Sequence, residues 1–62
     1  MELTLSGAET FVLRETLEKA IHEILMEIAN TDNRKMREGL KEREEMLKTI
    51  LAKIPAVAST AA

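Results

Sequence analysis

The stretch Asn30-Thr31-Asp32-Asn33 decides between a hairpin and one long helix. Each of these four side chains can hydrogen-bond to nearby backbone groups, which competes with the hydrogen bonds of a helix. The stretch lies between two segments of helical periodicity, so we predict a turn over residues 30–33 whose last residues cap a second helix. A continuous bent helix is the alternative, because neither Gly nor Pro forces a break here.

The segment before the turn is predicted to form a helix over residues 7–29. It begins with a capping box, in which the Ser6 hydroxyl accepts from a backbone N–H three residues on and Glu9 reaches back to the N–H of Ser6. Residues 1–5 are expected to form a short lead-in. The apolar residues recur at spacings of three and four and share one helix face. They are Leu13, Leu17, Ala20, Ile21, Ile24, Leu25 and Ile28.

The segment after the turn is predicted to form a helix over residues 33–54. Its apolar face holds Met36, Leu40, Leu47, Ile50, Leu51 and Ile54. Pro55 ends the pattern, because the residue before a proline is biased away from helical geometry. The small residues that follow have too little bulk to pack, so residues 55–62 are expected to form a disordered tail.

The two apolar faces match each other when the chain is folded back about Asp32. The fold class we predict is therefore an all-α, antiparallel two-helix hairpin. Charge agrees with this pairing, since residues 1–29 hold six acidic and two basic side chains, whereas residues 30–54 hold five acidic and seven basic ones. The facing pairs are Ile28 with Met36, Ile24 with Leu40, Leu17 with Leu47, and Leu13 with Leu51.

The chain is too short to complete a large core as a single hairpin. A protein of 62 residues buries only about 60% of its unfolded surface, and small folds of this kind are commonly completed by self-association. Both apolar faces are wider than one line of contact, so we expect a second copy to close a four-helix bundle, as a homodimer or higher oligomer. The alternative is that a larger partner protein covers these apolar faces. The residues expected at the core or oligomer interface are Leu13, Leu17, Ile21, Ile24, Leu25, Ile28, Met36, Leu40, Leu47, Ile50, Leu51 and Ile54.

Composition excludes several classes of protein. The absence of Cys excludes disulfide scaffolds, thiolate zinc sites and cysteine nucleophiles. No apolar run approaches the roughly 20 residues of a membrane span, and no secretion signal is present, so a cytoplasmic location is expected. The net charge of −2 is not that of a general nucleic-acid coat.

No arrangement of side chains in the sequence predicts catalysis or a cofactor. His22 is the only histidine, and a metal site would need further ligands, so a surface histidine beside Glu18 is the favoured interpretation. Acidic pairs one turn apart point to the polar side, where nothing encloses them. We therefore expect no enzyme activity, no cofactor and no metal.

One basic cluster offers an alternative function. Arg34, Arg37 and Lys41 could contact the backbone of RNA or DNA, which would make the protein a small nucleic-acid-binding regulator. Glutamates are interleaved with these residues, and no aromatic side chain accompanies them to stack on a base. Pairing with the acidic first helix is the stronger interpretation of this cluster.

Two arginines lie on the apolar faces, and one glycine lies beside the second face. Arg14 and Arg43 could extend past the helix contact with packed stems, could meet acidic groups of another copy, or could contact a partner protein. Structural roles are favoured for both. Gly39 costs helix stability, which suggests the close approach of another helix. Together these features favour a non-catalytic hairpin that homo-oligomerises and acts as a protein-interaction or regulatory adaptor module.

Overall fold

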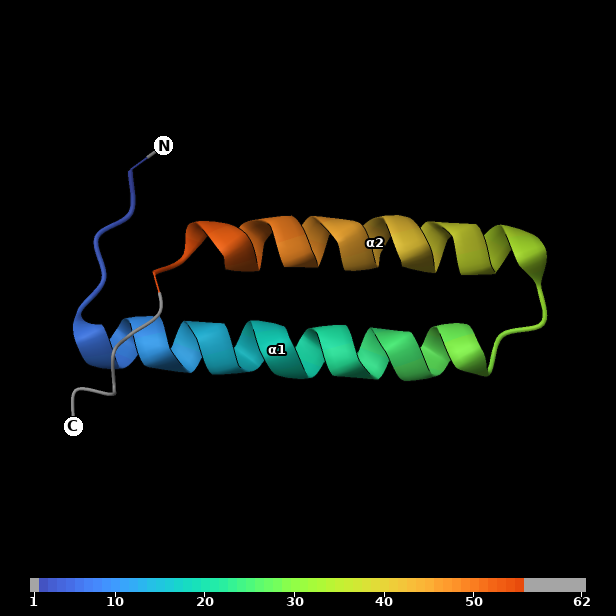
Figure 1. Cartoon of the computed structure of the whole chain (residues 1–62), viewed down its shortest axis with the longest axis horizontal. Helices are drawn as coiled ribbons and strands as arrows, with labels where there is room; N and C mark the ends of the chain where they lie inside the picture. The colour runs from blue at the N-terminus through green and yellow to red at the C-terminus, as the bar shows by residue number, and fades with distance from the viewer. Residues whose placement is uncertain (1, 56–62) are drawn as a thin grey trace.

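The chain folds into two antiparallel α-helices joined by a short turn (Figure 1). The computed structural model describes residues 2–55, in which α1 spans Gly7–Ala29 and α2 spans Arg34–Lys53. No strand occurs within this range. The predicted all-α hairpin is therefore confirmed, and both helices begin and end within one residue of the expected positions. Of the tail expected over residues 55–62, all but Pro55 lies outside the described residues.

The start of α1 is fixed by the predicted capping box. The Ser6 hydroxyl accepts a hydrogen bond from the Glu9 backbone N–H at 3.1 Å, and the Glu9 carboxylate accepts one from the Ser6 N–H at 2.9 Å. The two side chains thus satisfy N–H groups that no helical carbonyl can reach. The Thr10 hydroxyl donates to the Ser6 carbonyl at 2.9 Å, and Thr10 is buried.

The polar turn residues end one helix and begin the next. The Asn30 backbone N–H bonds to the carbonyls of Met26 and Glu27, both at 3.1 Å, and closes the last turn of α1. The side chain of Asn33 accepts from the Met36 backbone N–H at 3.0 Å and so caps α2. The continuous bent helix is excluded, because these side chains capture backbone groups at the break.

The hairpin is a single layer of two helices. Its dimensions are 43 × 27 × 13 Å, and the smallest of these is close to the diameter of one helix with its side chains, about 10–12 Å. Leu17 and Ile24 are the buried apolar residues within the described part of the chain, and no side chain there is completely withdrawn from solvent. The apolar contact is thus a narrow line between α1 and α2.

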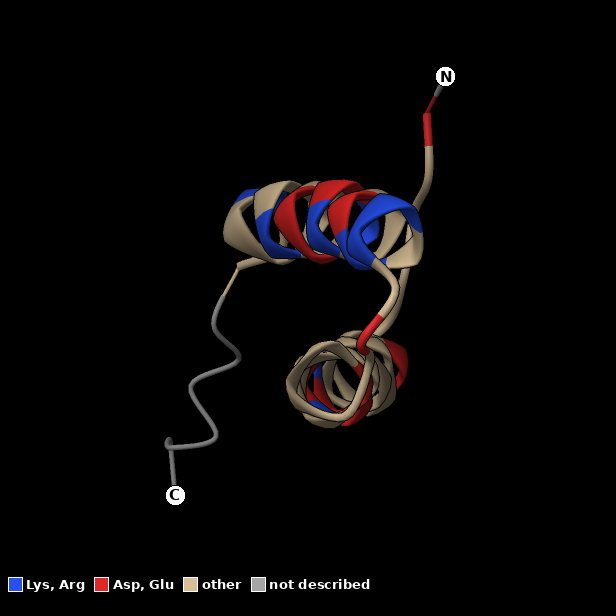
Figure 2. Cartoon of the chain, turned by 90° about the vertical axis from the view of Figure 1, so that its right-hand side faces the viewer, with Lys and Arg blue, Asp and Glu red and all other residues tan. Residues whose placement is uncertain are grey.

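Charge is distributed unequally between the helices. Seven of the 23 residues of α1 are charged, whereas eleven of the 20 residues of α2 are. Figure 2 shows acidic and basic residues interspersed along α2. Gly39 of α2 is exposed, and a Cβ added to it would meet nothing within 4 Å. The close helix approach expected at this glycine therefore does not occur within the hairpin.

Candidate interaction surface

The most deeply buried side chains of the seam between the helices are apolar on α1 and acidic on α2. Leu17 and Ile24 of α1 are 9% and 5% exposed, and Glu44 of α2 is 8% exposed. By the mirror register about Asp32, Ala20 lies at the level of Glu44, so a small side chain is expected to face a longer one. The sequence does not indicate that Glu44 is buried, because a carboxylate with a lysine one turn later is expected on the exposed side of a helix.

Glu44 is compensated by Lys48 one turn later. The Lys48 ammonium lies 2.9 Å from the Glu44 carboxylate, in the orientation that favours an i,i+4 pair. The hydrogen bond to Glu44 and the charge of Glu44 raise the pKa of Lys48 above its ordinary value of 10.5. The Glu44 carboxylate of this pair lies in the seam, whereas the Lys48 side chain is about half exposed and stays in contact with solvent.

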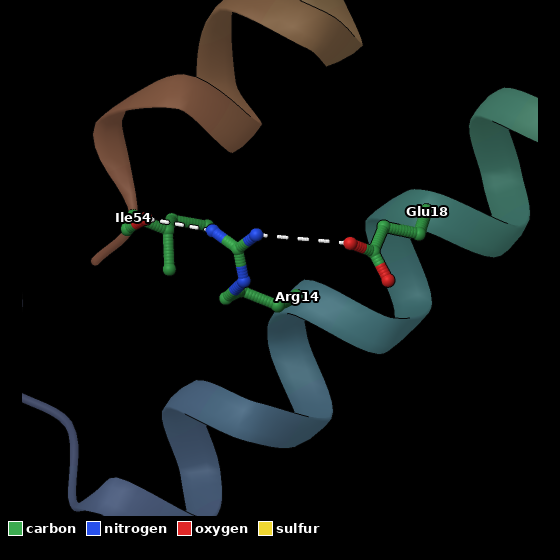
Figure 3. Close-up of polar contacts among 3 residues, drawn as sticks. All are labelled: Arg14, Glu18 and Ile54. Carbon is green, nitrogen blue, oxygen red and sulfur yellow. Dashed lines mark hydrogen bonds and ion pairs between the residues drawn. The ribbon is translucent and has the colours of Figure 1, made fainter. Parts of the chain in front are cut away.

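Arg14 ties the first part of α1 to the end of α2. Its guanidinium donates to the backbone carbonyl of Ile54 at 2.9 Å and lies 3.7 Å from the Glu18 carboxylate (Figure 3). The cation thus stands at the C-terminal end of α2, where the helix dipole favours positive charge. Arg14 therefore has a structural role within one chain. Glu18 pairs with Arg14, and no ion pair within residues 2–55 involves His22.

A second arginine makes the corresponding contact at the turn. The Arg37 guanidinium donates to the backbone carbonyl of Thr31 at 2.7 Å. One of the three residues proposed for nucleic-acid contact is therefore used to hold the turn. Arg34 and Lys41, the other two, are exposed. This arrangement weakens the nucleic-acid interpretation, because binding to a phosphate backbone depends on several free cations on one surface.

Most of the residues expected at the core or interface lie at the seam or beside it, and three do not. The three exposed ones are Leu25 on α1 and Met36 and Ile50 on α2. Met36 and Ile50 contribute little to the single hairpin and remain open to a partner. The buried or half-buried ones are Leu13, Leu17, Ile21, Ile24, Ile28, Leu40, Leu47, Leu51 and Ile54.

One side of the hairpin combines open apolar residues with unmatched charges. A shallow cavity of about 170 Å³ lies there, bordered by both helices. Arg43 is exposed and borders it together with Glu23 and Glu27 of α1. None of these three charged groups forms an ion pair within the part of the chain that the structure describes. The cavity is lined by Ala20, Glu23, Ile24, Glu27, Arg43 and Leu47.

Two further hollows lie toward the open end of the hairpin and share Leu13. One of about 370 Å³ is almost entirely apolar and lies along α1 between Ala8 and Thr16. The other, about 630 Å³, lies between the lead-in and the end of α2, with Leu5 and Ile54 among its lining residues. Neither hollow brings together titratable groups that could act as an acid and a base.

No group of three or more potential metal ligands occurs within residues 2–55. Neither α1 nor α2 combines the length and the apolar character that a membrane crossing requires. No protein-family model matches this chain, and no curated protein or solved structure is significantly similar to it. Function must therefore be inferred from the chain's own residues.

Proposed function

We propose that this protein is a non-catalytic helical hairpin that homo-oligomerises into a helical bundle and acts as a protein-interaction or regulatory adaptor module. The observation that supports this proposal is the excess of exposed over buried apolar side chains. Two apolar residues are buried, whereas eight large ones are between 42% and 64% exposed. The exposed ones are Leu3, Phe11, Val12, Leu25, Met26, Met36, Met46 and Ile50.

The size of the buried contact supports self-association. Burying an apolar side chain contributes about 1.5–3 kcal/mol, and ordering each residue costs about 1–2 kcal/mol in backbone entropy. A seam with two buried apolar residues offsets little of that cost over the 43 residues of the two helices. A second copy packed on the first would bury the remaining apolar face of each, as in four-helix bundles.

The adaptor role is supported by apolar residues that a two-layer bundle would leave uncovered. At roughly 100° per residue, Phe11 and Leu25 lie about 120° and 80° from Leu17, on the opposite side of α1 from Leu13 and Ala20. If one side of the hairpin is covered by a second copy, Phe11 and Leu25 remain at the surface. Exposed aromatic and aliphatic residues of this kind are typical anchors for a partner protein.

Analytical ultracentrifugation tests the self-association that this function requires. We expect a folded dimer or higher oligomer over the micromolar to millimolar range, with helical content falling as dilution separates the copies. A monodisperse, stably helical monomer throughout that range would contradict the proposal. Tight, steeply salt-dependent binding to RNA or DNA that is lost on charge reversal of Arg34 and Lys41 would instead favour the nucleic-acid-binding alternative.

A further inference from the structure

The apolar residues of α2 lie to one side of the seam. Glu44 occupies the seam position, and at roughly 100° per residue Leu40 and Leu47 lie about 40° and 60° away from it. Met36 and Ile50 lie further round in the same direction, about 80° and 120° from Glu44. The apolar stripe of α2 is therefore half turned toward α1 and half turned toward solvent.

The same side of α1 completes this surface, which we call the open flank. Ala20, Glu23 and Glu27 border one cavity together with Arg43 and Leu47 of α2, which places both helices on that side. Val12, Leu13 and Thr16 extend it toward the start of α1. The open flank comprises Val12, Leu13, Thr16, Ala20, Glu23 and Glu27 of α1, and Met36, Leu40, Arg43, Leu47 and Ile50 of α2.

The area of the open flank suits a second copy of the chain. Twenty helical residues span about 30 Å, and two packed helices are together about 20 Å wide, which gives a face of about 600 Å². Stable interfaces bury about 800 Å² on each partner, with smaller ones common in weaker complexes. A hairpin of the same length covers such a face along its whole extent.

Charge selects between the two ways in which open flanks can pack about a two-fold axis. With the axis across the helices, α1 lies on the partner's α1, so segments with six acidic and two basic residues face each other. With the axis along the helices, α1 lies on the partner's α2, and both turns are at the same end. Each acidic segment then meets one with seven basic and five acidic residues, which lowers repulsion.

The position of Arg43 agrees with the second arrangement. Antiparallel pairing places Arg43 at the level of Ile21, so Glu23 lies about 3 Å and Glu27 about 9 Å further along the axis, at 1.5 Å per residue. A two-fold axis along the helices leaves the position of every residue along that axis unchanged. The partner's Glu23 therefore lies over Arg43, about 3 Å from its level. An axis across the helices sets α2 on α2, so that Arg43 approaches the partner's Arg43.

We propose that two copies pair through the open flank, with α1 of each copy against α2 of the other, both turns at one end, and Arg43 beside the partner's Glu23. This inference rests on the proposed self-association and adds the face and the orientation to it. Arg43 and Glu23 then gain an ion pair that neither forms within one hairpin, and Glu27 lies one helical turn further along the partner's α1.

Distance measurement at the turn tests the orientation. Asp32 is exposed and the chain has no Cys, so Asp32→Cys gives a single spin-labelling position. With both turns at one end, the label sites are separated by about one helix–helix distance, roughly 10 Å before the label arms are added. With turns at opposite ends, they are separated by about the 43 Å length of the hairpin.

The outcomes separate this inference from the function on which it rests. A short distance in a dimer supports the orientation. A distance near the full length in a dimer overturns the orientation and leaves self-association standing. A monomeric mass with no coupling between labels overturns both.

Charge reversal tests the face. Arg43→Glu should weaken the dimer about tenfold, whereas Lys35→Glu, an equal charge change at another exposed position of α2, should change the dissociation constant by less than about threefold. Combining Arg43→Glu with Glu23→Arg should restore most of the affinity. Circular dichroism verifies that each variant stays helical. Equal effects of the two single reversals, or no recovery in the combined variant, would overturn the placement of Arg43.

Discussion

α1 and α2 are both amphipathic, yet they enter the seam differently. α1 directs the middle of its apolar face at α2 and buries Leu17 and Ile24, whereas α2 directs Glu44 at α1 and leaves Met36 and Ile50 exposed. The apolar stripes of two paired helices need not be aligned with their line of contact. Where one stripe is offset, the hairpin gains a side that is apolar, and that side is available to another molecule.

Substitution of Ile24, a buried apolar residue that α1 places in the seam, should unfold the hairpin. Ile24→Asp places a carboxylate at the least exposed apolar position, and we expect a loss of at least about 4 kcal/mol, from the lost apolar contact and the unpaired charge. This approaches the whole stability of a small domain, so helical circular dichroism and association should both be lost. Met26→Asp, at an exposed position of the same helix, is the control and should change stability by about 0.5 kcal/mol or less. Unchanged helicity in Ile24→Asp would contradict the described seam.

Removing the tie from α1 to the end of α2 should have the next largest effect. Arg14→Met keeps much of the side-chain bulk but loses the hydrogen bond to the Ile54 carbonyl, and we expect a loss of about 1–2 kcal/mol in chemical denaturation. Lys19→Met on the same helix is the control, since Lys19 is exposed and forms no ion pair within residues 2–55. Equal effects of the two variants would mean that the Arg14 contact contributes little.

Replacing the buried Glu44 of α2 with an apolar residue, like those that α1 buries in the seam, should raise the free energy of unfolding of the hairpin. Glu44→Leu replaces a buried carboxylate with an apolar side chain, and we expect a gain of about 1 kcal/mol in denaturant unfolding, because buried charged pairs are often less stabilising than apolar contacts. Glu45→Leu, at the neighbouring exposed position, should give no such gain. A loss of stability in Glu44→Leu would show that the pair with Lys48 contributes more than apolar packing.

The smallest expected effect is a pH dependence carried by Lys48. Its pKa is raised by Glu44, so the folded state holds this proton more tightly than the unfolded chain. The resulting stabilisation is present below the ordinary pKa of 10.5 and is lost as the pH rises through the higher folded value. The thermal midpoint should therefore fall slightly more above pH 10.5 in the native protein than in Lys48→Met. Parallel curves for the two proteins would contradict this link.

The helices and the turn could be predicted from the sequence alone, because they depend on capping, turn and proline signals between neighbouring residues. The capping box at Ser6 and Glu9, the polar stretch over residues 30–33 and the stop at Pro55 each depend on neighbouring residues only. The mirror pairing about Asp32 also indicated the hairpin, because the spacing of apolar residues sets which faces can meet. Such features are determined by backbone hydrogen bonding and periodicity, both of which are written in the local sequence.

The orientation of α2 about its own axis could not be predicted in the same way. Glu44 lies between Leu40 and Leu47 at the spacings of a contact position, and the opposing Ala20 leaves room for it, so a signal was present. The negative charge of Glu44, however, favoured the interpretation that it lies at the helix surface. The cost of burying Glu44 depends on whether Lys48 reaches it, which is a property of the folded pair. The three exposed residues Leu25, Met36 and Ile50 were likewise expected to be covered, and the rotation of α2 accounts for the last two.

The two arginine contacts have a consequence for the way in which the hairpin opens. Arg14 holds the carbonyl of Ile54 beyond α2, and Arg37 holds that of Thr31 beyond α1, so each helix secures the terminus of the other. Helix termini normally fray first, and their amides exchange with solvent most rapidly. Here the guanidinium groups, which remain charged at every pH a protein tolerates, slow that fraying at both ends of the molecule. The amides at the C-terminal ends of α1 and α2 should consequently exchange more slowly than those of a helix end that no side chain holds.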